Sequence, residues 1–466
     1  MKDGSRAKLL VFARTYALAL VINLIGQGNV GRIWRKGRLL RDAGPTGFAF
    51  AMAVAVGGGR VIQEHLPAFK APEWQKSFLA NILSSSAAIT LLFRSFSKRT
   101  AWSFDLTLFL VVRAADSLVS HGLLAFADHS DGDHDHKRRT LKARQSMVDS
   151  LLFQLSSARI MWCFFYLPHL LPKAYHKWIN ALARVDDRLT HTLRLIHSRD
   201  WLYSTGSTSH RTLLTSYAKD LGYPASWGDP YQIPNHGGKS ALNTWKAMDV
   251  PRGGIGGIPC ELVHGTVTGS SCTANASLRF FHAIPKALLI YLPVHIIPAL
   301  LRLRTVPSSK ELYSLLLPRI TGAFRSSAFL STFLAAFYYA VCMTRTIVPS
   351  FIAKMSPSLA QLFTNDFIDG PYGCILAGSL ACGGSIWIED SRRRGEMALY
   401  VLPRALETIF SQAKGRAGGI LERGLCTLCL AYLLTSAAHT PETLRGLSGW
   451  SLGLVLKPDV KNKKEE

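Results

Sequence analysis

Long apolar segments alternate with short basic ones along most of the chain. A helix needs roughly 20 apolar residues to cross a hydrocarbon core about 30 Å thick. Runs of this kind lie at about 9–25, 44–62, 77–93, 102–127, 150–171, 280–301, 322–343, 370–388, 396–411 and 420–438. Several contain charged residues, so we expect roughly eight to ten spans. The pattern predicts an all-α, polytopic membrane protein.

Small residues recur at every fourth position within several of these runs. Helices in lipid associate by close backbone approach, and stripes of small residues permit it. The predicted packing positions are Gly47, Ala51, Ala55 and Gly59; Ala323, Ser327 and Ser331; and Gly373, Ala377, Ala381 and Ser385, with Gly378 beside them. Residues 47–57 also alternate with period two, but a lone strand cannot satisfy its backbone in lipid. We therefore predict a helix there.

Two distant segments follow the same plan. Residues 97–120 and 391–411 each begin with a basic cluster, continue through apolar turns and reach an arginine followed three residues later by an acid. A duplication is the simplest explanation. It predicts two related four-helix membrane units at 1–127 and 277–412, separated by a polar insert at 128–276 that holds one span. Residues 413–466 form a final span and a polar tail.

The repeated charged pairs are Arg113 with Asp116 and Arg404 with Glu407. Residues three apart share one helix face, and an arginine at the bilayer centre costs about 2.5–3.5 kcal/mol unless it is paired or reaches the interface. Two interpretations remain open. The pairs either fix the register of packed helices or line a polar path for a substrate or ion.

Composition supports a membrane protein over a nucleic-acid-binding one. Lys and Arg number 54 against 30 Asp and Glu, a net charge of +24, while 48% of residues are hydrophobic. The cations lie mostly between apolar runs, where anionic lipid head groups attract them. We expect the lipid bilayer, and not nucleic acid, as the partner. No serine–histidine–acid set or pair of catalytic carboxylates is indicated, so we expect no enzyme activity.

The segment CELVHGTVTGSSC, residues 260–272, carries Cys260, His264 and Cys272. These are zinc-type ligands, although a structural zinc site usually has four ligands and a closer pair of cysteines. A disulfide between the two cysteines would close a short loop and contribute about 3 kcal/mol. A folded loop with reduced thiols is the third interpretation. No cofactor is predicted apart from this zinc alternative.

Residues 176–199 place apolar side chains on one helical stripe, with Arg and His opposite. The stripe predicts an amphipathic helix. It lies either on the membrane surface, with a tryptophan at its start, or within a folded insert.

Three stretches, at 260–272, 370–388 and 391–407, resemble the transmembrane protein 135 family, also called peroxisomal membrane protein 52. The small-residue helices are also similar in pattern to the mitochondrial preprotein translocase channel superfamily. The first resemblance implies a multi-pass protein of peroxisomal or mitochondrial membranes, linked to lipid and organelle homeostasis and without known catalysis. From it we expect a path for a metabolite or lipid; the alternative is a non-conducting scaffold that recruits protein partners through the insert. A homo-oligomer fits either role.

Overall fold

The computed structural model describes residues 10–20, 44, 47–65, 71–95, 101–128, 134–203, 209–300, 309–355, 364–410, 416–446, 449 and 451–453. Within these ranges the chain forms helices and turns and contains no extended strand. Five helices are long and apolar enough to cross a membrane: Glu73–Phe93, Ser103–Ala125, Cys272–Ile297, Leu312–Val348 and Gly419–His439. Shorter apolar helices lie at Leu10–Leu20, Phe48–Gln63 and Cys374–Ile388. The chain is an all-α, multi-pass membrane protein, as the sequence predicts.

The described spans are fewer than the eight to ten expected. The predicted spans at 150–171 and 396–411 overlap α7 (His134–Tyr166) and α18 (Ser391–Phe410), neither of which is among the candidate spans. Both helices include polar sequence: α7 begins with a histidine-rich and basic stretch, and α18 with SRRRGE. Three other expected runs coincide with the shorter apolar helices at Leu10–Leu20, Phe48–Gln63 and Cys374–Ile388.

The chain divides into two compact units, Met1–Gln145 with Leu402–Glu466 and Ser146–Val401. This division differs from the four domains drawn from the sequence. The final span joins the first unit instead of standing apart, and the polar insert shares the second unit with the apolar helices that follow it. Arg404 and Glu407 thus belong to the same unit as Arg113 and Asp116, whereas the duplication had placed the two pairs in separate units.

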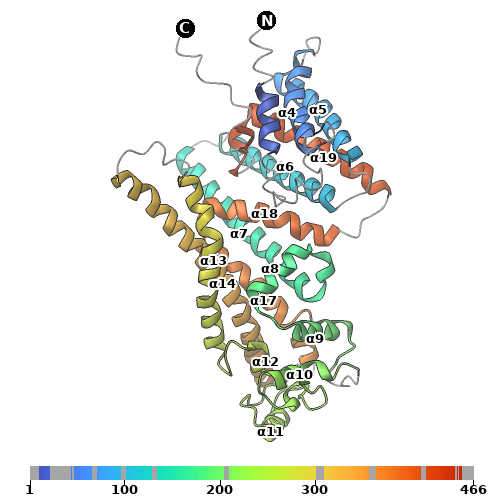
Figure 1. Ribbon diagram of the computed structural model, residues 1–466, viewed down its shortest axis with the longest axis vertical. Coiled ribbons are helices and arrows are strands. Elements are labelled where there is room, and N and C mark those ends of the chain that lie inside the picture. Colours follow the sequence, from blue (N-terminus) through green and yellow to red (C-terminus); the bar gives the residue numbers. More distant parts are fainter. Residues whose placement is uncertain are drawn as a thin grey trace. The chain divides into compact units, whose positions relative to one another are not determined.

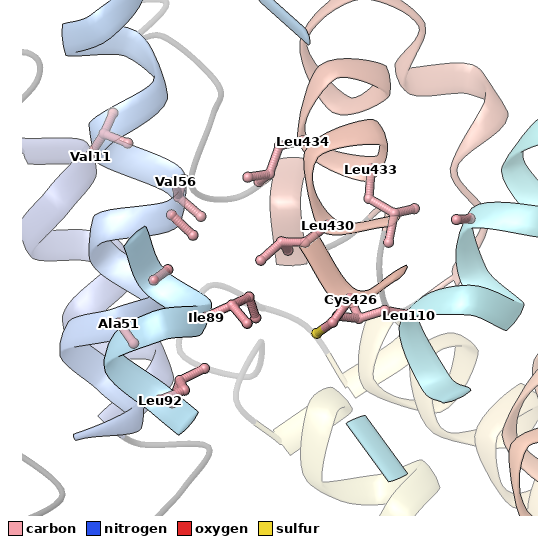
Figure 2. Packing of buried hydrophobic residues seen from close by; sticks show 13 residues of the cluster. Val11, Ala51, Val56, Ile89, Leu92, Leu110, Cys426, Leu430, Leu433 and Leu434 are labelled. Carbon is pink, nitrogen blue, oxygen red and sulfur yellow. The ribbon is translucent and has the colours of Figure 1, made fainter. Parts of the chain in front are cut away.

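The first unit is a helical bundle. It contains a helix at 10–20, α4 (Phe48–Glu64), α5 (Glu73–Ser95), α6 (Ala101–Asp128), α19 (Arg416–His439) and the short turn η5 (Pro441–Thr443). Figure 2 shows how α4 and α5 direct apolar side chains toward α19; the cluster includes Val56, Ile89, Leu430 and Leu434. The bundle core therefore combines helices from the two ends of the chain.

Small residues let α4 and α5 approach closely. Ala51 and Ala55 are fully buried, and the Ser84 hydroxyl donates to the Ala55 carbonyl oxygen at 3.0 Å. A Cβ on Gly59 would lie 2.1 Å from the Asn81 side-chain oxygen. Gly47 precedes the helix as its N-cap and does not lie within it. Backbone-to-backbone packing of this kind is how helices associate in lipid.

The second unit is built on a helical hairpin of α13 (Cys272–Leu300) and α14 (Ser309–Met355), which lie side by side in Figure 1. The long helix α14 also packs on α17 (Cys374–Gly383) and on the short helix η4 (Gly384–Ile388). Ala323, Ser327 and Ser331 of α14 are fully buried. The apolar span of α14 has 37 residues, so it is about 55 Å long and exceeds the hydrocarbon thickness.

The small-residue stripe at 373–385 lies differently from the prediction. Gly373 precedes α17, and Ala381 is exposed, whereas Gly378, Cys382 and Gly383 are buried. After Gly383 the chain continues as a 3₁₀ helix, which has about three residues per turn. Ser385 is buried on this second segment.

A polar module, residues 173–203 and 209–276, follows the end of α7. Its elements are α8 (Lys173–Ala183), α9 (Asp187–Ser198), α10 (Thr212–Asp220), η2 (Ala225–Gly228), α11 (Lys239–Ala247) and α12 (Cys260–His264), after the short turn η1 (Pro168–Leu170). Helix α16 (Asn365–Ile368) of the chain after α14 packs on this module through the Asn365 side chain, which donates to the Pro234 carbonyl oxygen at 3.0 Å. In Figure 1, α9 to α12 gather around one end of α14.

The predicted amphipathic helix at 176–199 is two helices. Arg184 adopts the left-handed conformation that ends α8, and the Asp186 side chain caps α9 by accepting from the backbone N–H of Arg188. Leu189 and Leu193 of α9 are buried inside the unit. Of the two alternatives, the buried stripe agrees with packing within a folded insert.

Candidate functional site

The polar module meets the hairpin at a buried ion pair. Arg345 of α14 and Asp369, which follows α16, are each 3% exposed at the side chain, and Arg345 Nε lies 2.7 Å from Asp369 Oδ1. A second guanidinium nitrogen, Nη2, donates to Asp369 Oδ2 at 3.2 Å. The contact is therefore bidentate, the strongest arrangement of this pair. We call Arg345, Asp369 and their direct partners the junction.

The polar module supplies further donors to the same carboxylate. The Tyr203 hydroxyl donates to Asp369 Oδ2, and the Ile258 backbone N–H donates to that oxygen at 3.3 Å. Arg345 in turn donates to the Ile258 carbonyl oxygen. Burial, and then the negative charge of Asp369, raises the pKa of Tyr203 well above its usual range, so the phenol stays a neutral donor. Every partner named here donates a hydrogen bond to the carboxylate.

Arg279 of α13 makes a second buried connection. Its guanidinium donates to the Asn275 side chain at 3.0 Å, to the Ala183 carbonyl oxygen at 2.7 Å and to the His264 carbonyl oxygen at 3.1 Å. The same group lies over the Tyr338 ring of α14, 3.5 Å from its centroid. One side chain thus joins α8, α12, α13 and α14.

Next to the junction, the structure brings the sequence-predicted ligands together. The ligand atoms of His264, Cys272 and Cys342 all lie within 4.8 Å of one another. The Cys260 side chain lies beside the thiols of Cys272 and Cys342 and interacts with both. All eight cysteines of the chain are free thiols. The cluster therefore holds four potential ligands, which is one more than the sequence indicated.

The four residues come from three elements. Cys260 and His264 are one helical turn apart in α12, Cys272 begins α13, and Cys342 lies in α14 three residues before Arg345. Cys260, His264 and Cys342 are buried, and Cys272 is half-buried. Hydrogen bonds from the other two thiols, together with the positive charges of Arg252 and Arg345, lower the pKa of Cys260 well below its usual range. The cluster favours a thiolate at this position.

Of the residues predicted to form intramembrane pairs, Arg404 contacts Glu407, whereas Asp116 is bound by Arg445. Arg404 Nη1 lies 2.6 Å from Asp105 Oδ2 and 3.1 Å from Glu407 Oε2, so one guanidinium serves two carboxylates. Asp116 is bound by Arg445 through two nitrogens, with Nε donating to Oδ2 at 3.1 Å. Arg113 is buried, and its guanidinium lies 5.3 Å from the Phe109 ring centroid.

The cavities found in the second unit are small. One, of about 30 Å³, is lined by residues of α9 and α14 together with Asp369, and another, of about 10 Å³, lies beside Arg279. A water molecule occupies about 30 Å³ in the liquid, so these spaces hold water at most.

Comparisons with protein-family models, with curated proteins and with solved structures found no significant match.

The sequence alone did not indicate Cys342, Arg345, Asp369 or Arg279. Cys342 and Arg345 lie in or next to an apolar run, where a cysteine is usually a small packing residue. The residues that they contact are distant in the chain. A polar residue within such a run is a signal that could have drawn attention to Arg345.

Proposed function

We propose that the protein is a non-conducting scaffold in peroxisomal or mitochondrial membranes, which holds its polar module rigidly on a membrane hairpin so that the module can recruit partners. The role in lipid and organelle homeostasis follows the resemblance in the three stretches described above. The junction is the observation that carries this proposal. A carboxylate bound by an arginine, a phenol and a backbone amide, with both charged side chains 3% exposed, fixes the module to α14.

The alternative, a path for a metabolite or lipid, makes another demand. A path needs a cavity large enough for its solute, typically about 300 Å³ or more for a small organic molecule. The cavities beside the junction have room only for water. The Arg404 guanidinium is already bound by two carboxylates, Asp105 and Glu407, and is not dedicated to a substrate there. Both observations favour the scaffold.

Rescue of cells that lack the protein separates the two functions. The first rescue variant replaces the charged triad by neutral residues of similar shape, Asp105→Asn, Arg404→Met and Glu407→Gln. The second, Asp369→Ala, removes the carboxylate of the junction. Both are checked for insertion into peroxisomal and mitochondrial membranes by extraction at high pH.

A scaffold predicts that the neutral triad restores normal organelle number and lipid content and that Asp369→Ala does not. Failure of the inserted neutral triad, together with solute flux through liposomes that contain the wild-type protein, would establish the path instead. Absence of the wild-type protein from both organelles would refute the proposed location.

A further inference from the structure

We propose that Cys260, His264, Cys272 and Cys342 bind one structural zinc ion, which clamps α12 and the start of α13 to α14. The inference is independent of the scaffold role, because it concerns the ligand set and not what the module recruits. Three observations support it: the geometry of the ligand atoms, the hydrogen bond of the histidine ring and the surrounding charge.

Three of the four ligand atoms are grouped closely enough to share one zinc ion after small movements. Zinc binds sulfur at about 2.3 Å and imidazole nitrogen at about 2.0–2.1 Å, so ligand atoms in a tetrahedron lie about 3.5–3.8 Å apart. His264 Nε2 lies 3.4 Å from Cys342 Sγ. The Cys272 sulfur lies within 4.8 Å of both atoms, and the Cys260 side chain lies beside the thiols of Cys272 and Cys342. His264, Cys272 and Cys342 are already grouped, and a movement of the Cys260 side chain toward His264 would complete the tetrahedron.

The histidine ring is held in the orientation that zinc ligation needs. His264 Nδ1 contacts the Gly269 carbonyl oxygen, and His264 Nε2 faces the sulfur of Cys342. A carbonyl can only accept, so this contact places the ring proton on Nδ1 and leaves the Nε2 lone pair directed at the cluster. A ligating histidine commonly donates its other N–H to a carbonyl or carboxylate in this way. The Arg279 bond to the His264 carbonyl oxygen fixes the backbone behind the ring.

Charge also favours a divalent ion with thiolate ligands. Three thiolates and one Zn²⁺ carry a net charge of −1, and a buried charge requires a partner. Arg252 and Arg345 provide positive charge at Cys260. Arg252 is held in place by donating to the Ile258 carbonyl oxygen at 2.8 Å.

The number and kind of ligands identify the ion and its role. Soft thiolates with one imidazole in a tetrahedral arrangement select zinc over magnesium or calcium, which prefer oxygen. Four protein ligands leave no open position for a water or a substrate, so the ion is structural and not catalytic. Half-buried Cys272 lies at the outer side of the cluster and offers a route for the ion to enter.

The test uses the full-length protein purified in detergent under reducing conditions without added metal. Elemental analysis should find about one zinc per chain in the wild type, and X-ray absorption at the zinc edge should fit three sulfur ligands and one nitrogen. Cys342→Ser and Cys260→Ser should each lower the zinc content at least fivefold. The matched control is Cys429→Ser, the same substitution at a half-buried cysteine of the first unit, which should keep one zinc.

A variant that fails to fold does not weaken the test, because absorption spectroscopy reads the ligands in the wild type itself. Zinc near zero in folded wild-type protein, iron in place of zinc, or a disulfide between any two of these cysteines under reducing purification would overturn the proposal. A zinc edge fitted by oxygen and nitrogen alone would do the same, since it would place the ion elsewhere.

Discussion

The ion pair at the junction offers the sharpest test of how the module is held. Replacing Arg345 by Met keeps much of its aliphatic length but removes the charge from a position where the side chain is 3% exposed. Asp369 would then keep the Tyr203 hydroxyl and the Ile258 N–H as donors but lose its positively charged partner. Breaking a buried pair from one side typically costs about 3–5 kcal/mol, because it leaves an uncompensated charge.

Removing the second charge should recover part of this loss. In Arg345→Met with Asp369→Asn, the amide oxygen still accepts from Tyr203, and no buried carboxylate remains. Neutral replacement of a whole buried pair is often tolerated. We therefore expect the double variant to be about 1–3 kcal/mol more stable than Arg345→Met alone.

Urea unfolding in detergent, followed by tryptophan emission, measures these differences. Trp201 and Trp245 are fully buried in the module, so its unfolding should shift their emission to longer wavelength. A loss of 3–5 kcal/mol lowers the folded-to-unfolded ratio about 10²- to 10⁴-fold. A decrease in the free energy of unfolding of less than about 1 kcal/mol for Arg345→Met would refute the coupled buried pair. The same conclusion would follow if the decrease in the double variant equalled the sum of the decreases in the two single variants.

Three further predictions follow from the contacts. Gly383→Ala should cost about 1–3 kcal/mol, because its Cβ would lie 2.6 Å from the Gln154 backbone, whereas Gly384→Ala, with nothing within 4 Å and a helical backbone, should be neutral or slightly stabilising in the same urea assay. Arg404→Ala should lower the yield of folded protein more than Arg404→Ala with Glu407→Ala, measured by size-exclusion chromatography, because the single change leaves two carboxylates together; equal yields would contradict burial of these groups. Removing metal with a strong chelator should lower the urea midpoint of wild-type protein, and added zinc should restore it, while a midpoint indifferent to chelator would argue against a structural ion.

The membrane character of the chain follows from its sequence alone. Apolar runs of about 20 residues can satisfy their backbone in lipid only as helices, so length and composition predict the class of fold. The small residues Ala51 and Ala55 of α4 are buried, and the segment that alternates with period two is a helix. In the stripe after Gly373, Gly378 and Ser385 are buried but Ala381 is exposed, and the chain changes from α to 3₁₀ geometry after Gly383.

Part of the candidate metal site could also be predicted from local spacing in the sequence. Cys260, His264 and Cys272 lie within 13 residues of one another, so their proximity requires only a short loop. The fourth ligand, Cys342, comes from the far side of the hairpin and could not be told from a packing cysteine by its neighbours in the chain. Cys342 meets the other three residues only because α13 and α14 pack together as a hairpin.

What the sequence determined is the set of helices and the bilayer as their surroundings, since both depend on runs of neighbouring residues. What only the tertiary structure decided is which charges and ligands meet: Arg345 with Asp369, Arg404 with Asp105, Asp116 with Arg445. It also decided that α19, from the far end of the chain, packs into the first bundle. An apolar helix face matches many partners about equally well, so the pairing depends on complementary shape and on satisfying a few buried charges across long distances in the chain.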